Sequence, residues 1–517
     1  MTLATPADVL VVGGGPAAAA AARLLASWGH AVVVATGRPA GSPPLAESLP
    51  PSTRKLFGLL GLMDEVERGG FVTTTGNTSW WGDAGCRALP FGGGTSGFQV
   101  ERGRLDRLLL DAAGDAGAGL LRGATVRHVD LRGGDVPVLA RVRDADGRSR
   151  TVRARRILDC SGRAGVLARD GLRERTEGFA TIALVGVWAR GDGWPLEDPS
   201  HTLVESYDEG WTWSVPVSPT RRYVAAMVDP ASAVLRRGGG LDLLYRRELA
   251  RTHHLRRLLE GATAVAGPWA YGATPYGARR FGGDAFLLVG DAGSFLDPLS
   301  SYGVKKALAS GWLAAVATHT ALTRPAMAGA ALELFEERER EVWRRYRTLT
   351  AGFYRDAGAA HGGPFWSARA DAAGPGAGGG SMPAGDRPAR LHPDPAALVG
   401  EPAVREAFQR LRASGDVRLR PAATLRRLRR PTVRGREVVL EERLASPALP
   451  AGLGVVRGVD LPLVARLARD RGDVPGLFEA YRRAGNPVDL PDFLGALSVL
   501  LAAGMLENAA VPAGAAP

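Results

Sequence analysis

The first fifty residues alternate short apolar runs with a glycine turn and an apolar helix. Residues 8–12 form an apolar run with β-branched side chains, which predicts a buried strand. Three glycines and Pro16 follow. An alanine-rich stretch over residues 19–28 then predicts a helix, and residues 31–35 predict a second strand. This order of elements is a βαβ unit, in which the two strands lie parallel.

The turn of this unit has the spacing of a dinucleotide-binding fingerprint. From Gly13 to Ala18 it reads G-x-G-x-x-A, and the glycines let the backbone turn tightly and approach a pyrophosphate. The helix N-terminus then presents free N–H groups and the positive end of its dipole to that anion. A purely structural glycine turn is the alternative. The residues expected to bind are Gly13, Gly15, Pro16, Ala17 and Ala18.

The acidic residue normally expected at the end of the second strand is missing. The chain reads Val34-Ala35-Thr36-Gly37-Arg38 at that point. We therefore expect ribose recognition to come from Thr36, from the backbone or from elsewhere. Arg38 is equally consistent with a solvated surface residue.

A second strand–turn–helix junction is expected near residue 290. An acidic residue in such a junction can accept hydrogen bonds from a sugar alcohol, and the helix N-terminus can stabilise an anionic oxygen or ring. A helix-entry turn is the plain alternative for its Asp-Pro pair. Two such junctions in one chain point together to a dinucleotide. This one comprises a strand over residues 285–289, then Gly290, Asp291, Asp297, Pro298 and Gly303, and a helix over residues 304–322.

Residues 153–163 predict a third strand that ends in a backbone turn. Cys160 in that turn is expected to be a small buried apolar residue rather than a nucleophile, because no base is evident nearby. Cys86 lies in a predicted hairpin. Two cysteines offer neither a zinc cluster nor a disulfide framework, so no metal is expected.

Composition adds an arginine-rich positive charge. The chain has 517 residues and a net charge of +12, and its 45% hydrophobic and 23% charged residues exclude a disordered or collagen-like chain. No recognised nucleic-acid motif accompanies the charge, so we expect no nucleic-acid partner. The N-terminus has no basic region, and glycines, Pro16 and Arg23 interrupt the first apolar stretch. We therefore expect a cytoplasmic protein without a membrane span.

These three pieces, in this order, resemble the flavin-dependent monooxygenases of the aromatic hydroxylase type, and within them the flavin-dependent halogenase branch. The resemblance covers about residues 5–370. It implies an α/β fold, with a doubly wound, glutathione-reductase-like FAD-binding domain and an inserted antiparallel sheet as the substrate domain. It places the FAD pyrophosphate at the first glycine turn, the ribitol side at Gly290 and Asp291, and the isoalloxazine against residues 297–303 and Val304.

Further motifs support the resemblance. Arg102 matches the R-x-x-L-D helix start that contributes to FAD binding, although a solvated arginine at a helix end has the same pattern. Glu47 and Ser48 match the segment that covers the flavin. Residues 211–216 read W-T-W-S-V-P and resemble the W-x-W-x-I-P signature of flavin-dependent halogenases, although alternate tryptophans also fit a strand face that packs on the core. Residues 353–354 and 364–369 resemble the halogenase tail, or represent aromatic helix packing.

The departures from this pattern decide the expected chemistry. Flavin-dependent halogenases need a lysine shortly after the flavin-covering segment, which handles hypohalous acid, whereas residues 70–81 contain none. Ser300 stands where tryptophan halogenases place a glutamate. Lys305 and Lys306 would suit charge compensation near a phosphate or reduced flavin, or else face solvent. The expected substrate pocket comprises Trp211, Trp213, Pro216, Trp80 and Thr74.

The resemblance without that lysine implies an FAD-dependent monooxygenase. It would hydroxylate an indole- or phenol-type substrate with O2 through a flavin C4a-hydroperoxide, and NAD(P)H or a partner flavin reductase would supply electrons. The flavin carries the difficult step, so no catalytic dyad is required. An aromatic halogenase, and a non-catalytic flavoprotein or peptide-binding regulator, are the alternatives. Candidate catalytic residues are Tyr302, His201 and Glu205, with Tyr207 and Asp208 as further general bases.

Residues 297–308 also resemble a particular subgroup of these flavoproteins. Its members hydroxylate a tryptophan side chain within a partner polypeptide, on the way to a tryptophan-derived quinone cofactor. This resemblance implies a peptide or protein substrate and a wide, solvent-accessible cleft.

The chain is expected to divide into three parts. Residues 1–370 interleave the FAD-binding and substrate domains, with the substrate sheet at about residues 70–100 and 175–280. Residues 371–387 are rich in glycine and predict a flexible linker. Residues 388–510 predict a winged-helix-like accessory domain, which weakly resembles the domain that captures leader peptides; DNA binding, a helical cap or a dimerisation unit are alternatives. Its expected elements are two short strands near residues 433 and 438–443, and helices over residues 461–468, 474–483 and 490–506, with Asp460 and Asp489 as N-caps.

Overall fold

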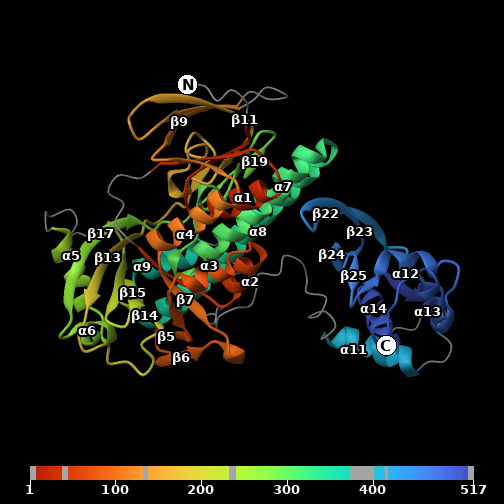
Figure 1. Cartoon of the computed structure of the whole chain (residues 1–517). Helices are drawn as coiled ribbons and strands as arrows, with labels where there is room; N and C mark the ends of the chain where they lie inside the picture. The colour runs from red at the N-terminus through yellow and green to blue at the C-terminus, as the bar shows by residue number, and fades with distance from the viewer. Residues whose placement is uncertain are drawn as a thin grey trace. The chain divides into compact units, whose positions relative to one another are not determined.

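The computed structural model describes the chain in six stretches: residues 7–37, 45–131, 138–231, 240–372, 401–413 and 417–509. The chain divides into two compact units, Met1–Pro388 and Ala389–Pro517 (Figure 1). Arg38, and the predicted linker from residue 373 onward, lie outside the described residues. Within these stretches no helix is both long and apolar enough to cross a membrane.

The first unit is built on an eight-stranded sheet whose central strands run parallel. β1 pairs in parallel with β2 and with β11, which confirms the predicted βαβ unit. Its side chains at Val9, Leu10 and Val11 are fully buried, as expected for a strand covered on both faces. The strands lie in the order β19 (Gly282–Gly283), β20 (Phe286–Leu288), β11 (Ser149–Asp159), β1 (Ala7–Val12), β2 (Val32–Thr36) and β8 (Gly119–Arg122), and β11 also pairs with the hairpin of β10 (Val138–Arg143) and β9 (Thr125–Asp130).

Three helices pack around this sheet. α1 (Pro16–Ser27) contacts both α4 (Arg102–Asp115) and α7 (Gly303–Thr323). The helix α1 begins three residues earlier than predicted because Pro16, whose ring fixes φ, stands at its first position. Gly311 of α7 lies against α1, where a Cβ would meet the Ala17 carbonyl oxygen at 2.5 Å. A glycine therefore lets the two helices approach closely.

A seven-stranded sheet is built mainly from the part of the chain in which the sequence predicts a substrate domain. It is antiparallel except for the pairing of β14 with β5. Two helices, α5 (Leu241–Ala250) and α6 (His254–Leu259), pack on one face, and aromatic residues from two other helices pack on the opposite face. The strand order is β17 (Thr263–Gly272), β13 (Ile182–Ala189), β16 (Arg221–Val228), β15 (Gly210–Ser218), β14 (Thr202–Tyr207), β5 (Gly76–Trp80) and β6 (Cys86–Pro90).

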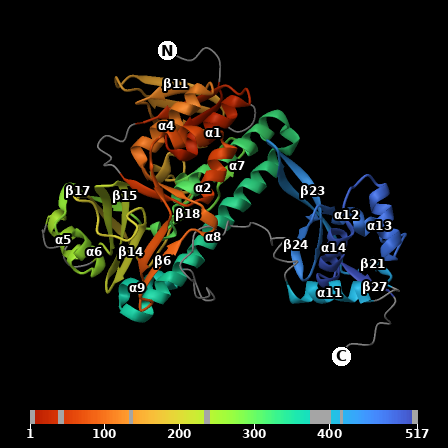
Figure 2. The same ribbon diagram turned by 60° about the horizontal axis from the view of Figure 1, so that its bottom comes forward.

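The remaining elements of the first unit join the two sheets. A long helix, α8 (Ala328–His361), runs along the unit and is followed by α9 (Pro364–Asp371) at one end (Figures 1 and 2). Aromatic side chains of both helices enter the core beneath the seven-stranded sheet. The other elements are a small sheet of β3 (Ala46–Leu49), β7 (Gly97–Glu101) and β4 (Val72–Thr74), a pair of β12 (Arg173–Arg175) with β18 (Tyr276–Ala278), and the helices α2 (Ser52–Leu59) and α3 (Met63–Arg68).

The second unit has its own hydrophobic core of leucine, valine and aromatic side chains. The three predicted helices are present, and the carboxylates of Asp460 and Asp489 cap two of them, each accepting a 2.8 Å hydrogen bond. Asp473 caps the third in the same way. The elements are α11 (Pro402–Ala413), β21 (Leu419–Pro421), β22 (Arg426–Arg434), β23 (Glu437–Ser446), β24 (Leu449–Leu453), β25 (Val455–Val456), β26 (Val459–Asp460), α12 (Leu461–Leu467), α13 (Val474–Arg483), α14 (Leu490–Ala502) and β27 (Leu506–Asn508).

Candidate functional site

One large cavity lies in the first unit where its two main sheets meet. Its empty volume is about 1350 Å³, including the part open to solvent. Its lining includes the N-terminal ends of α1 and α7, the strand β3, the turn after β11 and one face of the seven-stranded sheet. The predicted junctions near residues 15, 160 and 290 therefore converge on a single cavity.

Strand alternation determines which side chains of the seven-stranded sheet reach the cavity. Successive side chains of a strand point to opposite faces, so residues two apart share a face. The sheet presents a wall that is almost wholly apolar. The residues of this sheet that line the cavity are Ala183 and Val185 of β13, Thr202 and Val204 of β14, Trp211, Trp213 and Val215 of β15, Met227 of β16, and Tyr271 and Gly272 of β17.

The same alternation corrects part of the predicted substrate pocket. Pro216 follows Val215 on the strand and lies on the opposite face, outside the cavity lining. Trp80 stacks on His254 of α6, with ring centroids 4.3 Å apart. Thr74 is fully buried, and its hydroxyl donates to the Gly76 carbonyl oxygen at 3.1 Å. These three residues do not line the cavity, whereas Trp211 and Trp213 do.

Two of the candidate catalytic residues also lie outside the cavity lining. The Glu205 carboxylate caps α6, accepting from the N–H groups of His253 at 2.6 Å and Leu255 at 2.8 Å. Nδ1 of His201 lies 2.9 Å from the Thr78 hydroxyl, and its Nε2 lies 3.4 Å from an Asp198 oxygen. Burial lowers the pKa of His201. Neither side chain lines the cavity, so their positions give no support to the predicted general-base role.

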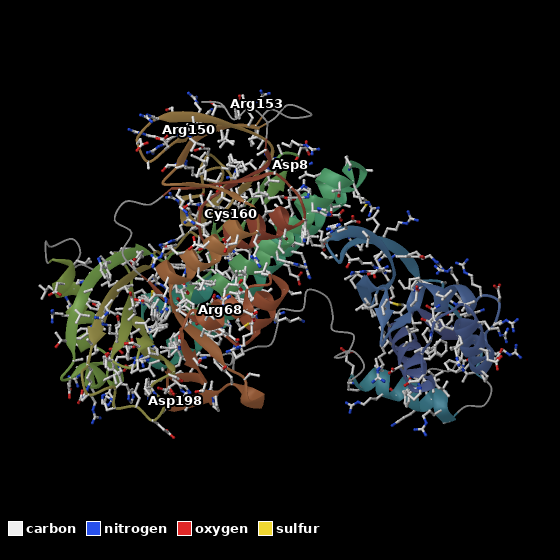
Figure 3. The ribbon with its side chains drawn as sticks, in the orientation of Figure 1. Asp8, Arg68, Arg150, Arg153, Cys160 and Asp198 are labelled. Carbon is white, nitrogen blue, oxygen red and sulfur yellow. The ribbon has the colours of Figure 1, made fainter. Side chains whose placement is uncertain are left out.

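Figure 3 shows that Asp198 lies apart from Cys160, which lines the cavity. Asp198, the partner of His201, lies at the lower edge of the unit, well away from Cys160. Tyr207 and Asp208 are likewise absent from the cavity lining. Tyr302 does line it, with its ring stacked on Tyr346 at 4.3 Å between centroids. A catalytic role for Tyr302 stays a prediction.

The glycine turn before α1 packs tightly against the protein at Gly13 and has free space beside it at Gly15. At Gly13, where φ is +121°, a Cβ would lie 2.2 Å from the Cys160 carbonyl oxygen, so only glycine fits between β1 and β11. At Gly15 the nearest atom to a Cβ would be an Arg102 nitrogen at 3.8 Å. Gly15 is the N-cap of α1 and offers no side chain to the first N–H groups of the helix. The turn is therefore open on its cavity side.

The residues predicted from the first fingerprint divide accordingly. Gly15, Pro16 and Ala17 line the cavity, whereas Gly13 and Ala18 lie behind it. A Cβ on Gly14 would lie 2.6 Å from the Thr36 hydroxyl oxygen, so Thr36 packs beside the glycine turn. Thr36 is absent from the cavity lining, so its predicted contact with a ribose has no support from its position.

A three-residue ion-pair network borders the open side of the turn. The Arg102 guanidinium lies 3.2 Å from a Glu47 oxygen and 3.1 Å from an Asp106 oxygen. Burial raises the pKa of the Glu47 carboxyl, and the Arg102 charge opposes that rise. Glu47, Ser48 and Arg102 all line the cavity. The predicted flavin-covering segment and the R-x-x-L-D helix start therefore meet at this network.

Both backbone polar groups of Gly290 join the loop after β20 to α7 by hydrogen bonds. The Gly290 N–H donates to the Ser310 hydroxyl at 2.9 Å, and the Gly290 carbonyl oxygen accepts from the Lys306 ammonium group at 2.9 Å. Lys306 also donates to the Ser294 carbonyl oxygen, and its nitrogen lies 3.7 Å from an Asp291 oxygen. Lys305 and Lys306 are both buried, so the solvent-facing alternative for them is wrong.

A buried hydrogen-bond chain connects the Asp-Pro turn to the tryptophan motif. The Trp211 indole N–H donates to the Tyr354 hydroxyl at 3.3 Å, and that hydroxyl donates to an Asp297 oxygen at 2.8 Å. The other Asp297 oxygen accepts from the Leu299 N–H at 3.0 Å. Asp297, Pro298, Gly303 and Val304 line the cavity. Strand, turn and helix therefore meet at one buried carboxylate.

The residues present fit the expected FAD. Two helix N-termini, at Gly15 and at Gly303, open onto the cavity, and a Cβ on Gly303 would meet nothing within 4 Å. Such termini favour the negative charge of a diphosphate and of a flavin ring. One Asp291 oxygen is buried without a hydrogen bond, which fits an acceptor for a sugar hydroxyl. No group of side chains among the described residues could hold a metal ion.

Cys160 completes the wall of the cavity, whereas the tail aromatics Phe353, Tyr354, Phe365 and Trp366 pack in the core beneath the seven-stranded sheet and do not line it. Cys160 lines it and is 5% exposed, and burial raises the pKa of its thiol well above its usual value. This confirms that Cys160 is buried, and its lack of a nucleophilic role stays a prediction. Sequence reasoning did not identify Tyr354, Lys306 and Ser310 as contacts of the predicted motifs. Their partners lie 57, 16 and 20 residues away in the chain, which no local pattern shows.

The chain matches the tryptophan halogenase family over residues 87–377. It is 29% identical to the tryptophan 2-halogenase of Chondromyces crocatus over 365 residues, which cover 68% of this chain and 69% of that protein. Among solved structures, the myxobacterial chondrochloren halogenase CndH is 30% identical, with a TM-score of 0.65, over 70% of this chain and 85% of its own.

A further solved structure resembles nearly the whole chain. The peptidyl tryptophan dihydroxylase QhpG matches 97% of this chain and 100% of its own, with a TM-score of 0.67 and 23% identity. At this identity the likeness concerns the fold. It extends through the second unit, as does the likeness to the flavin-dependent halogenase CmlS, which is 24% identical and covers 98% of this chain and 96% of its own with a TM-score of 0.74.

Proposed function

The chain belongs to the tryptophan halogenase family of flavin-dependent enzymes, and from that premise we propose that it hydroxylates an aromatic ring of the indole or phenol type. The observation that carries the proposal is the composition of the cavity. One half is lined by helix N-termini and polar groups suited to FAD, and the other half is an apolar wall that contains Trp211 and Trp213. No lysine is among the described residues that line it.

The residues that would hold FAD follow from the geometry of the cavity. The first N–H groups of α1, beside Gly15, would bind the diphosphate. Asp291 would accept a hydrogen bond from the ribityl chain, and the turn from Asp297 to Gly303 would lie against the flavin ring. Bound and reduced FAD supplies the activation of O2.

The apolar wall would orient the substrate and exclude water. Its valine, methionine and tryptophan side chains offer no general base, and Asp297, a buried carboxylate that lines the same cavity, already accepts two hydrogen bonds. Such a wall suits an electron-rich ring that needs orientation more than proton transfer. We propose that Trp211 and Trp213 contact that ring.

The absence of a lysine in residues 70–81 favours oxygen transfer over halogen transfer. In the halogenases that this chain resembles, a lysine amine handles hypohalous acid. The stretch where it is expected reads G-F-V-T-T-T-G-N-T-S-W-W, and its Thr74 side chain is buried away from the cavity.

Halogenation is the second candidate function. It is favoured by the family match and by relatives that are named as halogenases. The two functions share the FAD site and the apolar wall, and they differ in whether a halide ion takes the oxygen before the ring does.

We further propose that the ring is part of a peptide or protein. QhpG, which hydroxylates peptidyl tryptophan, shares the fold over both units. The second unit would then serve partner binding, and a separate flavin reductase or NAD(P)H would deliver electrons. The accessory domain would comprise residues 388–510.

Mass spectrometry of reaction products tests the proposal. The purified chain, loaded with FAD, would receive reduced flavin, isotopically labelled O2 and either chloride or bromide. The substrates would be indoles, phenols, tryptophan-containing peptides and co-expressed products of neighbouring genes. We expect a product that has gained labelled oxygen, at a yield that does not depend on the halide. The Gly15→Ala variant, in which a methyl group occupies the open side of the turn, is the matched control with the weakened FAD binding that we expect.

Two results would decide against hydroxylation. A product that gains chlorine or bromine establishes the second candidate. A chain that binds no FAD under any of these conditions overturns both candidates, because both require the flavin.

A further inference from the structure

The hydrogen-bond chain from Trp211 through Tyr354 to Asp297 joins three elements that are distant in sequence. Trp211 belongs to β15, Tyr354 to α8, and Asp297 to the turn that precedes α7. Trp211 and Tyr354 are 1% and 2% exposed, and Asp297 is 5% exposed. The hydroxyl of Tyr354 both accepts and donates, so it uses its full bonding capacity between the two walls of the cavity.

Asp297 is a buried carboxylate that depends on few partners. Its printed hydrogen bonds come from the Leu299 N–H and the Tyr354 hydroxyl. Burial raises the pKa of this carboxyl, and the charge of Arg369 on α9 opposes that rise. Arg369 is itself shared, because it lies 3.7 Å from an Asp229 oxygen and donates to Thr181. Loss of the Tyr354 hydroxyl would therefore leave one carboxylate oxygen buried without a donor.

The turn that Asp297 begins is also strained. Ser301, which lines the cavity, has a φ of +48°, in the left-handed region that side-chain-bearing residues rarely adopt. Such a conformation persists only where its surroundings hold it. The carboxylate of Asp297 holds one end of the turn, and α7 begins two residues after Ser301 at the other end.

We propose that Tyr354 is a positioning residue, which holds the Asp297–Pro298 turn against Trp211 and so fixes the distance between the cofactor side and the substrate side of the cavity. The inference rests on the proposed function for its consequence, since a flavin and a ring must meet there at a set separation. Tyr354 does not line the cavity and acts through Asp297 and Trp211. The alternative is that its hydroxyl serves only the packing of α8.

The same sheet contains a matched hydrogen-bond chain that is remote from the cavity. The Trp188 indole N–H donates to the Tyr245 hydroxyl at 3.0 Å, and that hydroxyl donates to the Val224 carbonyl oxygen at 2.9 Å. Tyr245 is 2% exposed, like Tyr354, and none of these three residues lines the cavity. Tyr245→Phe is therefore a control for the loss of a buried tyrosine hydroxyl.

The experiment compares FAD affinity for Tyr354→Phe, Tyr245→Phe and the unaltered chain by quenching of flavin fluorescence. We expect both variants to be less stable to heat by a similar amount. Only Tyr354→Phe should bind FAD more weakly, by about tenfold, the size expected when a hydrogen bond to a carboxylate is lost. Equal affinity of the two variants would overturn the proposal.

The pH dependence of FAD binding is a second measurement that distinguishes the two roles. If the Tyr354 hydroxyl served only the packing of α8, its loss would leave this pH dependence unchanged. The Tyr354 hydrogen bond opposes the rise in the Asp297 pKa, so its loss should move the acidic limb of the affinity profile to higher pH. This shift, whose direction alone follows from the Asp297 carboxyl, should vanish when Asp297→Asn is combined with Tyr354→Phe. A shift that survives in the double variant would assign it to another group and contradict the inference. An unaltered chain that fails to bind FAD would instead overturn the proposed function.

Discussion

Lys306 donates a 2.9 Å hydrogen bond to the carbonyl oxygen of Gly290, and this contact ties the first turn of α7 to the loop after β20. The same ammonium group reaches Ser294 and lies near Asp291. Glu339 of α8 is buried close by, and burial raises the pKa of its carboxyl while the Lys306 charge opposes that rise. One buried cation therefore organises the loop whose acid is proposed to bind the ribityl chain.

Replacing Lys306 with methionine should disrupt this loop. Two backbone carbonyl groups lose their donor, so we expect a loss of about 2 kcal/mol of stability, the usual cost of leaving buried acceptors unpaired. FAD affinity should fall with it. Thermal unfolding and flavin fluorescence measure the two effects. Lys55→Met, at an exposed position of α2, is the control and should change neither. A Lys306→Met variant that binds FAD normally would show that the loop keeps its shape without this cation.

Gly13 and Gly15 should respond differently to alanine. At Gly13 a Cβ would overlap the Cys160 carbonyl oxygen, so Gly13→Ala should lose stability by several kcal/mol or fail to fold. At Gly15 a Cβ would meet no protein atom closer than 3.8 Å. Gly15→Ala should therefore unfold at the same temperature as the unaltered chain but bind FAD at least about tenfold more weakly. Normal FAD binding by Gly15→Ala would place the diphosphate elsewhere.

The Arg102–Glu47 contact should make stability depend on pH in a defined direction. Burial raises the Glu47 pKa above its ordinary value of 4.5, and Arg102→Met should raise it further. Because the pKa of Glu47 is higher in the folded than in the unfolded state, protonation of this carboxyl stabilises the folded chain. This stabilisation is fully present below pH 4.5 and is lost as pH rises through the folded-state pKa of Glu47. Chemical denaturation should thus show a larger loss for Arg102→Met at about pH 7 than at about pH 5. Arg107→Met, exposed on the same helix, should show the same small change at both values.

The two cysteines should differ in reactivity. Cys86 is exposed, whereas Cys160 is buried and burial raises its thiol pKa well above the usual value. Since the thiolate is the nucleophile, iodoacetamide should label Cys86 alone in the folded chain and both residues after denaturation. Peptide mass spectrometry identifies the labelled residue. Rapid labelling of Cys160 in the folded chain would show that the turn after β11 opens readily.

The βαβ unit was predictable because its signals are local. A β-branched apolar run, a glycine turn and an alanine-rich stretch lie next to one another in the chain, and each has one dominant interpretation. The same holds for the helices of the second unit, where Asp460 and Asp489 begin apolar stretches with helical spacing. Cap and periodicity agree there, so the bounds are close to those expected.

The substrate pocket was harder to predict because a motif does not state which face of a strand it occupies. Trp211 and Trp213 share a parity and a face, while Pro216 has the other parity; period-two alternation would have separated them. The role of Glu205 could not be found in this way. Its carboxylate caps a helix that begins 49 residues later, so only the packed fold shows that it is committed to structure.

The continuous helix α8 carries both Glu339, beside Lys306, and Tyr354, beside Asp297. Fifteen residues of α-helix span about 22 Å, and each added residue turns everything beyond it by about 100°. A single insertion or deletion between these two positions would swing one of them away from its partner, whatever residue was gained or lost. Substitutions on the exposed surface of α8 therefore leave both contacts in place. The number of residues between Glu339 and Tyr354, in contrast, must stay constant for both contacts to form.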